Sequence, residues 1–428
     1  MHLLLNEIRH KPLLWLLAFV PVVFAAAKLK PDAHTLLFVL SLLAIVPLAA
    51  LLSHATESVA AKTGDAVGGL LNATLGNLTE LIIALAALRA GEYMLVKASV
   101  AGAIVTNTLF MLGASFLLGG LKHHTQEFNR VSARMQAGLL FLATVALLIP
   151  SAVGEADSAA KAEFTQELSL GLSMLLILAY GLGMLFSLKT HPELFASAES
   201  GETGEEHWPI GLALATLAGV TVLVAIVSEI FVESVQKAAE AFGMTPAFVG
   251  FIVVALVGAA AEMASAFSGA RKNRLDLSVG IALGSAAQIA LFVAPVLVLL
   301  SYVMGPTPMN LQFWPGAVVM MLIATLTASL VTNSGRSAWF VGVLVLMVIA
   351  LWLACRKLQP NDVARMAANW LLAALALQIA LGIATLLLRV PVALAAAHQA
   401  GAVTVFAIAL WLAHALRHRV AATSNLRI

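Results

Sequence analysis

One segment of this chain occurs twice, and both copies carry a glutamate inside an otherwise apolar stretch. Adding 182 to a residue number carries the first copy, which begins at Gly68, onto the second without a gap. The paired positions include Gly76 and Gly258, Glu80 and Glu262, and Gly102 and Gly284. An ionisable side chain within a membrane costs about 3 kcal/mol on insertion scales, so each glutamate marks a functional-site candidate. Glycine-interrupted apolar segments that recur in two halves are typical of membrane transporters.

The composition indicates a membrane protein. The chain has 428 residues, of which 61% are hydrophobic and 11% charged, against roughly 25% charged in soluble domains. Cys355 is the single cysteine, which excludes a disulfide within one chain. Eleven apolar segments are of roughly the length that spans a bilayer. They lie at about 12–28, 34–53, 68–90, 94–119, 136–151, 167–188, 209–232, 246–268, 278–304, 313–332 and 338–355.

The spans divide into one extra helix and two sets of five. An odd number of spans per copy places the two copies in opposite orientations, so the sequence predicts an all-α integral membrane protein with two inverted repeats. The expected divisions are 1–33 for an N-terminal transmembrane helix, 34–188 for the first repeat, 189–208 for an acidic loop, 209–355 for the second repeat and 356–428 for an appended two-helix hairpin. Basic residues before an apolar run that ends Ala25-Ala26-Ala27 also fit a cleavable signal peptide.

Charge predicts the orientation. Counted along the eleven spans, eleven Lys and Arg residues fall on the side of the N-terminus and six on the other side. The positive-inside rule therefore predicts a cytoplasmic N-terminus. The loop between the repeats holds five glutamates and is then cytoplasmic too, either as a solvated linker or as a low-affinity collector of cations.

At the repeats the sequence resembles a known family. The run Gly76-Asn77-Leu78-Thr79-Glu80 is similar to the first signature of the calcium/proton antiporters in the cation/calcium exchanger superfamily, roughly G-N-A-T-E. The second copy resembles the second signature, and the likeness covers about residues 34–355. The resemblance implies Ca²⁺/H⁺ exchange in a membrane, with Glu80 and Glu262 as cation ligands. It also implies carbonyl groups freed at Gly76 and Gly258.

Calcium chemistry fits two carboxylates. Ca²⁺ takes roughly 6–8 oxygen ligands, and one buried carboxylate does not supply enough of them. With no metal bound, two nearby carboxylates in a low dielectric cannot both stay ionised, so the pair takes up protons. The site is then neutral with two protons or with one divalent ion, which is antiport chemistry. A Na⁺/H⁺ or K⁺/H⁺ exchanger could use the same pair, and the sequence leaves that alternative open.

Neutral polar residues surround the two glutamates in the sequence. Asn77 is expected to lie one helical turn before Glu80 and to face the same way. Asn107 and Gln288 lie in the following spans, accompanied by Thr106 and Ser285. All five are expected to line the site or couple protons. Hydrogen bonding between packed helices is the alternative role.

The chain departs from the family pattern at several positions. The second signature usually reads G-N-A-A-E-H, but Ala259 and Met263 replace its asparagine and histidine. Lys97 and Ala103 stand where glutamine and serine are usual. Lys97 is expected to extend toward the membrane surface, and if it reached the site its charge would alter selectivity. These changes leave the preferred cation open.

The last 70 residues resemble another family. The apolar runs at 366–388 and 391–416, with His398-Gln399 between them, look like the last helical hairpin of haem A synthase. In that enzyme such a histidine ligates haem together with one on another helix, and no complete four-helix half is present here. The sequence therefore predicts a transporter that is not an enzyme, needs no cofactor and transports Ca²⁺ and H⁺. A haem-related membrane redox protein is the alternative. The expected location is a bacterial inner membrane, and the oligomeric state stays open.

Overall fold

The protein is helical almost throughout. The computed structural model describes residues 7–9, 11–63, 68, 70–71, 74–152, 159–191 and 208–356, with ten scattered residues after 356. The acidic loop and the C-terminal hairpin predicted from the sequence therefore lie outside the described residues, apart from Lys189–His191, Trp208 and those scattered positions.

The N-terminal part comprises a short 3₁₀ segment and the helices that lead into the first repeat. These elements are η1 (Pro12–Ala18), α2 (Phe19–Leu29), α3 (His34–Ala60), α5 (Leu78–Arg89), α6 (Tyr93–Val105), η2 (Thr106–Met111), α7 (Leu112–His123), β1 (Thr125–Glu127), α8 (Arg130–Ala152), α9 (Ala159–Leu185) and η3 (Phe186–Thr190). The segment η1 and α2 together form the predicted extra first span.

The second part repeats this order. Its elements are α11 (Ile210–Ala241), α12 (Pro246–Phe248), η5 (Val249–Val254), α13 (Ala255–Gly258), α14 (Ala260–Arg271), α15 (Leu275–Gln288), η6 (Ile289–Val293), α16 (Ala294–Ser301), α17 (Pro315–Val331), β2 (Arg336–Ala338) and α18 (Trp339–Arg356).

The repeat seen in the sequence is also a repeat of structure. Adding 182 to the bounds of α5 gives the bounds of α14, Ala260–Arg271. The π-helical segments η2 and η6 correspond in the same way to within one residue. A π-turn widens a helix and is common at functional sites, so both repeats are irregular at equivalent places. The molecule is an integral membrane protein built from two inverted five-helix repeats after one extra helix.

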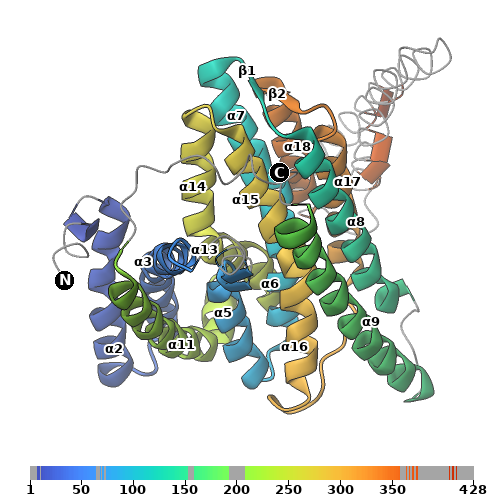
Figure 1. Cartoon of the computed structure of the whole chain (residues 1–428). Helices are drawn as coiled ribbons and strands as arrows, with labels where there is room; N and C mark the ends of the chain where they lie inside the picture. The colour runs from blue at the N-terminus through green and yellow to red at the C-terminus, as the bar shows by residue number, and fades with distance from the viewer. Residues whose placement is uncertain are drawn as a thin grey trace, which may run out of the picture.

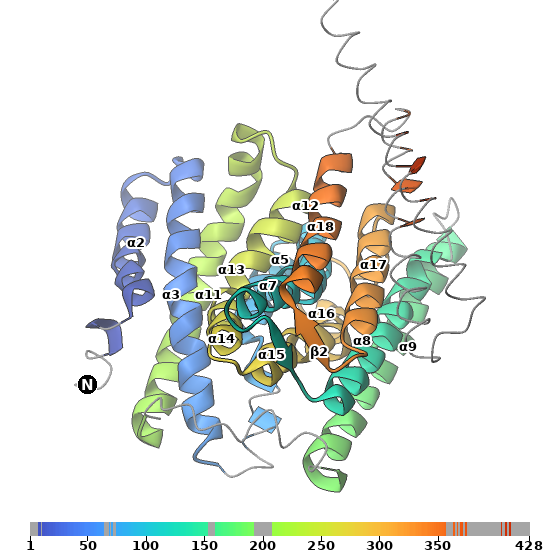
Figure 2. The same ribbon diagram turned by 90° about the horizontal axis from the view of Figure 1, so that it is seen from above.

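Equivalent helices pair across the two repeats. Helix α3 packs along α11, and α8 packs along α17. Figure 2 shows these two pairs on opposite sides of the molecule, with α5, α7 and α13–α16 between them. Figure 1 shows the shorter helices α13 and α5 in the middle of the molecule. The interrupted elements therefore lie between these two helix pairs.

Glycine permits the closest contact between the repeats. A Cβ atom on Gly102 of α6 would lie 2.2 Å from the carbonyl oxygen of Phe251 in η5, and one on Gly250 would lie 2.7 Å from Cβ of Ala98. Membrane helices approach closely where small residues meet, so these two glycines allow α6 and η5 to cross. Further along these two segments lie Asn107 in η2 and Glu262 in α14.

A helix or part of one accompanies each predicted span, but the lengths differ. Among the described residues, seven helices are long and apolar enough to cross a membrane, and the pair Pro246–Gly258 and Ala260–Arg271 makes an eighth with a 57° bend. Helix α17 is shorter, at 17 residues, and α5 has 12. The sequence predicted uniform spans of about 20 residues because apolar content alone does not show where a helix breaks.

Candidate cation site

Both glutamates occupy the same position in equivalent helices. Glu80 is the third residue of α5 and Glu262 the third residue of α14. The N–H groups of a first helical turn have no partner within the helix, and the helix dipole favours negative charge there. Glu80 makes such a bond with its own backbone. A carboxylate at this position therefore receives stabilisation even inside a membrane.

The break ahead of each helix is short. Asn77 and Ala259, which are equivalent by the repeat, are the N-cap residues of α5 and α14. Asn77 has φ −99° and ψ 31° and lies in a turn, so the expectation that it continues the helix of Glu80 is wrong. Asparagine is a strong N-cap residue because its side chain accepts a bond from the first turn. Here that side chain makes no capping bond and turns to the other repeat instead.

Four buried side chains form a hydrogen-bonded chain between the repeats. Asn107 Nδ2 donates to Ser285 Oγ at 2.9 Å, and Ser285 Oγ donates to Asn77 Oδ1 at 2.7 Å. Asn77 Nδ2 in turn donates to Gln288 Oε1 at 2.7 Å. None of the four is more than 7% exposed. The structure thus brings together four of the five neutral residues singled out from the sequence, two from each repeat.

Three oxygen atoms beside this chain are sealed from solvent and accept no hydrogen bond from the described residues. They are Glu80 Oε1, Glu262 Oε2 and Asn107 Oδ1. The Glu262 carboxyl group also forms a hydrogen bond with Ser285 and interacts electrostatically with Glu80. Buried polar atoms are normally paired, so three unpaired oxygens in one place fit a site that takes an ion or protons.

Gly258 supports Glu80 directly. A Cβ atom on Gly258 would lie 2.9 Å from Cγ of Glu80 and 3.1 Å from its Oε1. The carboxylate of the first repeat therefore lies against the backbone of the second repeat, four residues before Glu262. Gly76 occupies the equivalent turn just before Asn77. Both glycines are thus at the helix breaks, where the sequence analysis expected freed carbonyls.

The hydrogen-bonded chain has no counterpart on the other side of the repeat axis. The residues equivalent to Asn77, Ser285, Gln288 and Asn107 are Ala259, Ala103, Thr106 and Ile289. Only Thr106 is polar; it is 6% exposed at the start of η2 and takes no part in the chain. The departures from the family pattern thus make the site asymmetric, with the neutral polar groups bonded to one another around Ser285.

Lys97 is held away from the glutamates. Its Nζ donates to Asn310 Oδ1 at 2.6 Å, in the connection between α16 and α17. Lys97 lies ten residues before Asn107 on α6 and its π-helical continuation, which is about 15 Å along a helix axis. The expectation that the ammonium group extends away from the site agrees with this contact.

The sequence analysis missed one acidic neighbour. Glu57, near the end of α3, interacts electrostatically with Glu262, and Ser53 Oγ donates to its Oε1 at 3.2 Å. The sequence could have indicated Glu57, because it is an acidic residue in a continuous helix that is otherwise apolar over most of its length. The position lies outside the repeated segment, which is why the search for paired glutamates passed over it.

These features agree with the comparison to known proteins. The sequence matches the sodium/calcium exchanger protein family over residues 33–189 and 212–358. The chain belongs to this family. The two matched ranges correspond to the two repeats, and both glutamates of the site fall within them.

Several members of the family are close relatives. The chain is 41% identical over 345 residues to a Ca²⁺/H⁺ antiporter of Aphanothece halophytica, covering 77% of this chain and 92% of the relative. It is 42% identical to the Ca²⁺/H⁺ antiporter ChaA of Bacillus subtilis, covering 72% and 88%. The solved structure of native YfkE has 38% identity and a TM-score of 0.67, covering 79% and 96%. The H⁺/Ca²⁺ exchanger CAX has the same TM-score at 15% identity, which shows a shared fold.

Proposed function

We propose that the protein exchanges Ca²⁺ for H⁺ across a membrane, with Glu80 and Glu262 binding either protons or the cation. The observation that carries this proposal is the placement of the two glutamates. Each is the third residue of an interrupted helix, each comes from a different repeat, and each keeps one buried oxygen that accepts no hydrogen bond from the described residues. Relatives that cover most of the chain are named as Ca²⁺/H⁺ antiporters, which supports the choice of ion.

The available oxygens suit calcium. Ca²⁺ binds roughly 6–8 oxygen ligands at about 2.3–2.6 Å and accepts carboxylate, amide and backbone carbonyl groups. The site offers two carboxylates and Asn107 Oδ1, and the helix breaks at Gly76 and Gly258 add carbonyls. Two carboxylates also match the charge of a divalent ion, because the loaded site is then neutral inside the membrane.

The burial of the two carboxyl groups supports a proton-loaded state. Glu262 interacts electrostatically with Glu80 inside the protein. Two nearby carboxylates in a low dielectric cannot both stay ionised, so the pair takes up at least one proton when no metal is bound. The charge of an arriving Ca²⁺ then displaces that proton, which couples the two ions at one site.

Alternating access follows from the inverted repeats. Because the site lies between two halves of opposite orientation, a sliding movement of the helices can open it first to one face and then to the other. We infer that the protein lies in a bacterial inner membrane with its N-terminus in the cytoplasm. Lys and Arg residues are more numerous on the side of the N-terminus, as the positive-inside rule requires.

The direct test is radiolabelled calcium uptake into inverted membrane vesicles under an imposed pH gradient. Uptake should follow the size of the gradient and collapse with a protonophore. Sodium and potassium should compete weakly. If either monovalent cation is transported in exchange for protons while calcium is not, the site is that of a monovalent cation exchanger.

The variants that test the two glutamates are Glu80→Gln and Glu262→Gln, which keep the shape of the side chain and remove its charge. Each should bring exchange to background, because losing one of two buried charge contacts costs about 3 kcal/mol, or roughly a hundred-fold in affinity. Glu163→Gln, on the peripheral helix α9, is the control for a lost carboxylate. Near-normal exchange by either site variant, with normal insertion, would rule out the two-carboxylate site.

A further inference from the structure

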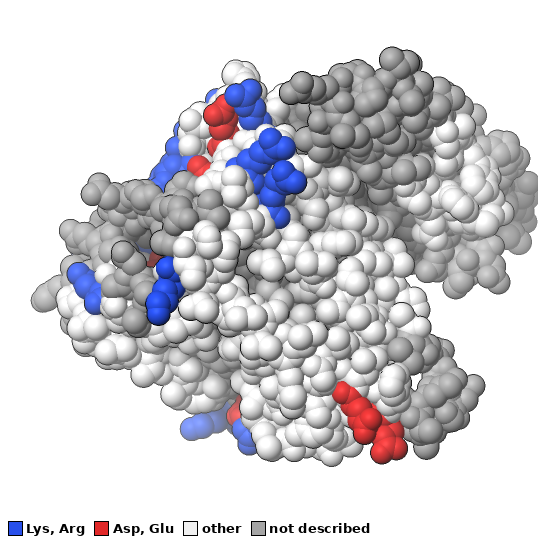
Figure 3. Space-filling model, turned by 45° about the vertical axis from the view of Figure 1, so that its right-hand side comes forward, with Lys and Arg blue, Asp and Glu red and all other residues white. Residues whose placement is uncertain are grey.

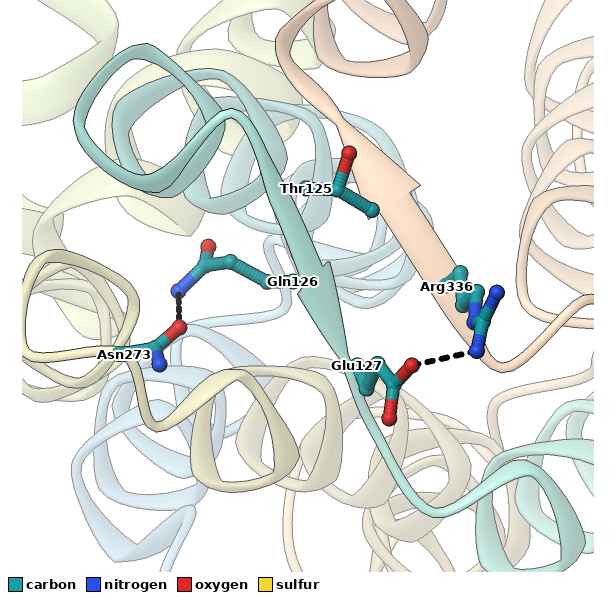
Figure 4. A pocket seen from close by; sticks show the side chains of 5 residues that line it. All are labelled: Thr125, Gln126, Glu127, Asn273 and Arg336. Atoms are coloured by element: carbon teal, nitrogen blue, oxygen red, sulfur yellow. Dashed lines mark hydrogen bonds and ion pairs between the residues drawn. The ribbon is translucent and has the colours of Figure 1, made fainter.

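A solvent-facing hollow lies at one end of the molecule, far along the helices from the glutamates. Its volume is about 460 Å³, and it is lined by Thr125, Gln126, Glu127, Asn273 and Arg336. Figure 4 shows these side chains around the β1–β2 ribbon and the turn between α14 and α15. Strand β1 pairs antiparallel with β2, with Thr125 opposite Ala338. The volume lies within the usual range of small-molecule sites, about 300–1,000 Å³.

Hydrogen bonds and an ion pair hold polar side chains of the hollow in place, but some of their donors and acceptors have no partner among the described residues. Gln126 Nε2 donates to the carbonyl of Ala270 at 2.9 Å and to Asn273 Oδ1 at 3.0 Å. Its Oε1 is buried without a partner among the described residues. Arg336 Nη2 contacts Glu127 Oε1 at 2.7 Å, and both side chains are 70% exposed. A guanidinium group has five N–H donors, so this single contact leaves donors for a further acceptor.

Positive charge surrounds the hollow. Arg130 lies beside the turn that precedes Arg336, because a Cβ atom on Gly335 would lie 2.9 Å from Cβ of Arg130. Lys122 Nζ reaches across to the carbonyl of Arg271 at 3.0 Å. The exposed basic residues of this end are Lys122, Arg130, Arg134, Arg271, Lys272 and Arg336. Figure 3 shows blue side chains gathered at the upper end of the molecule, above a broad uncharged surface.

Exposed apolar side chains adjoin the basic ones. Leu121 is 62% exposed, Trp339 46% and Phe340 55%. Trp339 directly follows β2, and a Cβ atom on Gly120 would lie 2.2 Å from its backbone nitrogen, so α7 packs against this junction. Tryptophan is enriched where a membrane meets water. A hollow with basic residues around it and exposed apolar side chains beside it fits the depth of lipid headgroups.

We propose that this hollow binds the phosphate of an anionic phospholipid. Arg336 and Arg130 contact the phosphate, Asn273 and Thr125 the polar headgroup, and the acyl chains lie along Trp339 and Phe340. Basic pockets between helices at the cytoplasmic face attract anionic headgroups, and each nearby Lys or Arg contributes about five-fold in affinity. The apolar flank favours a lipid over a free phosphate, which would gain nothing from those side chains.

The test measures the melting temperature of the purified full-length protein as phosphatidylglycerol is titrated into phosphatidylcholine mixed micelles. Arg130→Gln, which leaves the Arg336–Glu127 ion pair intact, should weaken the apparent lipid affinity about five-fold, and Arg130→Gln with Arg336→Gln about twenty-five-fold. Arg89→Gln is the matched control, because Arg89 also pairs with a glutamate, Glu229, at 3.0 Å and is 68% exposed. Its lipid affinity should equal that of the wild type.

Two results would overturn the proposal. In the first, Arg130→Gln and Arg89→Gln weaken the lipid effect equally, which would make it a response to overall charge. In the second, inorganic phosphate at the same concentration stabilises the protein as much as the lipid does. Neither readout involves transport, so both are independent of the proposed exchange activity.

Discussion

Ser285 connects the two repeats within the site. Its hydroxyl bonds Asn77, Asn107 and Glu262. Ser285→Ala leaves Asn77 Oδ1 and Asn107 Nδ2 buried without that partner, and each such group costs about 1–3 kcal/mol. We expect the apparent calcium affinity in vesicle uptake to fall about ten-fold. Ser234→Ala is the control, since Ser234 is equally buried but bonds a carbonyl of its own helix. Equal losses in the two variants would contradict a special role for Ser285.

Single residues were predictable where the cost of burying them is high. Glu80 and Glu262 were found because a carboxylate in a repeated apolar segment needs a reason to be there. The order of the hydrogen bonds was not predictable. Whether Asn77 caps its own helix or reaches Gln288 depends on the approach of segments 211 residues apart. The same applies to Lys97, whose partner Asn310 lies in a connection without a sequence signal.

At the scale of elements, the break before α14 is the part most directly tied to the site. Gly258→Ala places a methyl group 2.9 Å from Cγ of Glu80, so the carboxylate has to move. We expect the variant to insert normally and to lose about ten-fold or more in apparent calcium affinity, measured by uptake at varied calcium. Gly219→Ala on α11 is the control, because nothing lies within 4 Å of a Cβ atom there. Unchanged affinity in Gly258→Ala would show that Glu80 does not depend on the break.

The order of the elements was predicted, but their lengths and interruptions were not. Apolar content placed the spans and the exact offset between copies predicted equivalent helices, as α5 and α14 confirm. The π-helical segments η2 and η6 have no signature in apolar content, because widening a turn by one residue changes no residue type. The β1–β2 pair was also missed, since three-residue strands lack a measurable alternation.

At the scale of the whole molecule, both repeats are complete by the end of α18 at Arg356. A chain that stops after Lys357 should therefore insert and retain exchange close to the full rate, measured as calcium uptake in vesicles. His398→Ala in the full chain should have no effect, because the haem-binding alternative rests on that residue. Loss of exchange by a correctly inserted truncation would make the hairpin an integral part of the transporter. Residues 358–428 contain no member of the proposed site.

The central claim is that one pair of glutamates is neutralised either by protons or by calcium. It is tested most directly by counting the protons released when calcium binds to the purified protein, using calorimetry in buffers of different ionisation enthalpy. The account predicts that protons leave as calcium binds, approaching two for each ion where the empty site is fully protonated, and that Glu262→Gln removes most of this release. Calcium binding to the wild-type protein with no release of protons at any pH would contradict it.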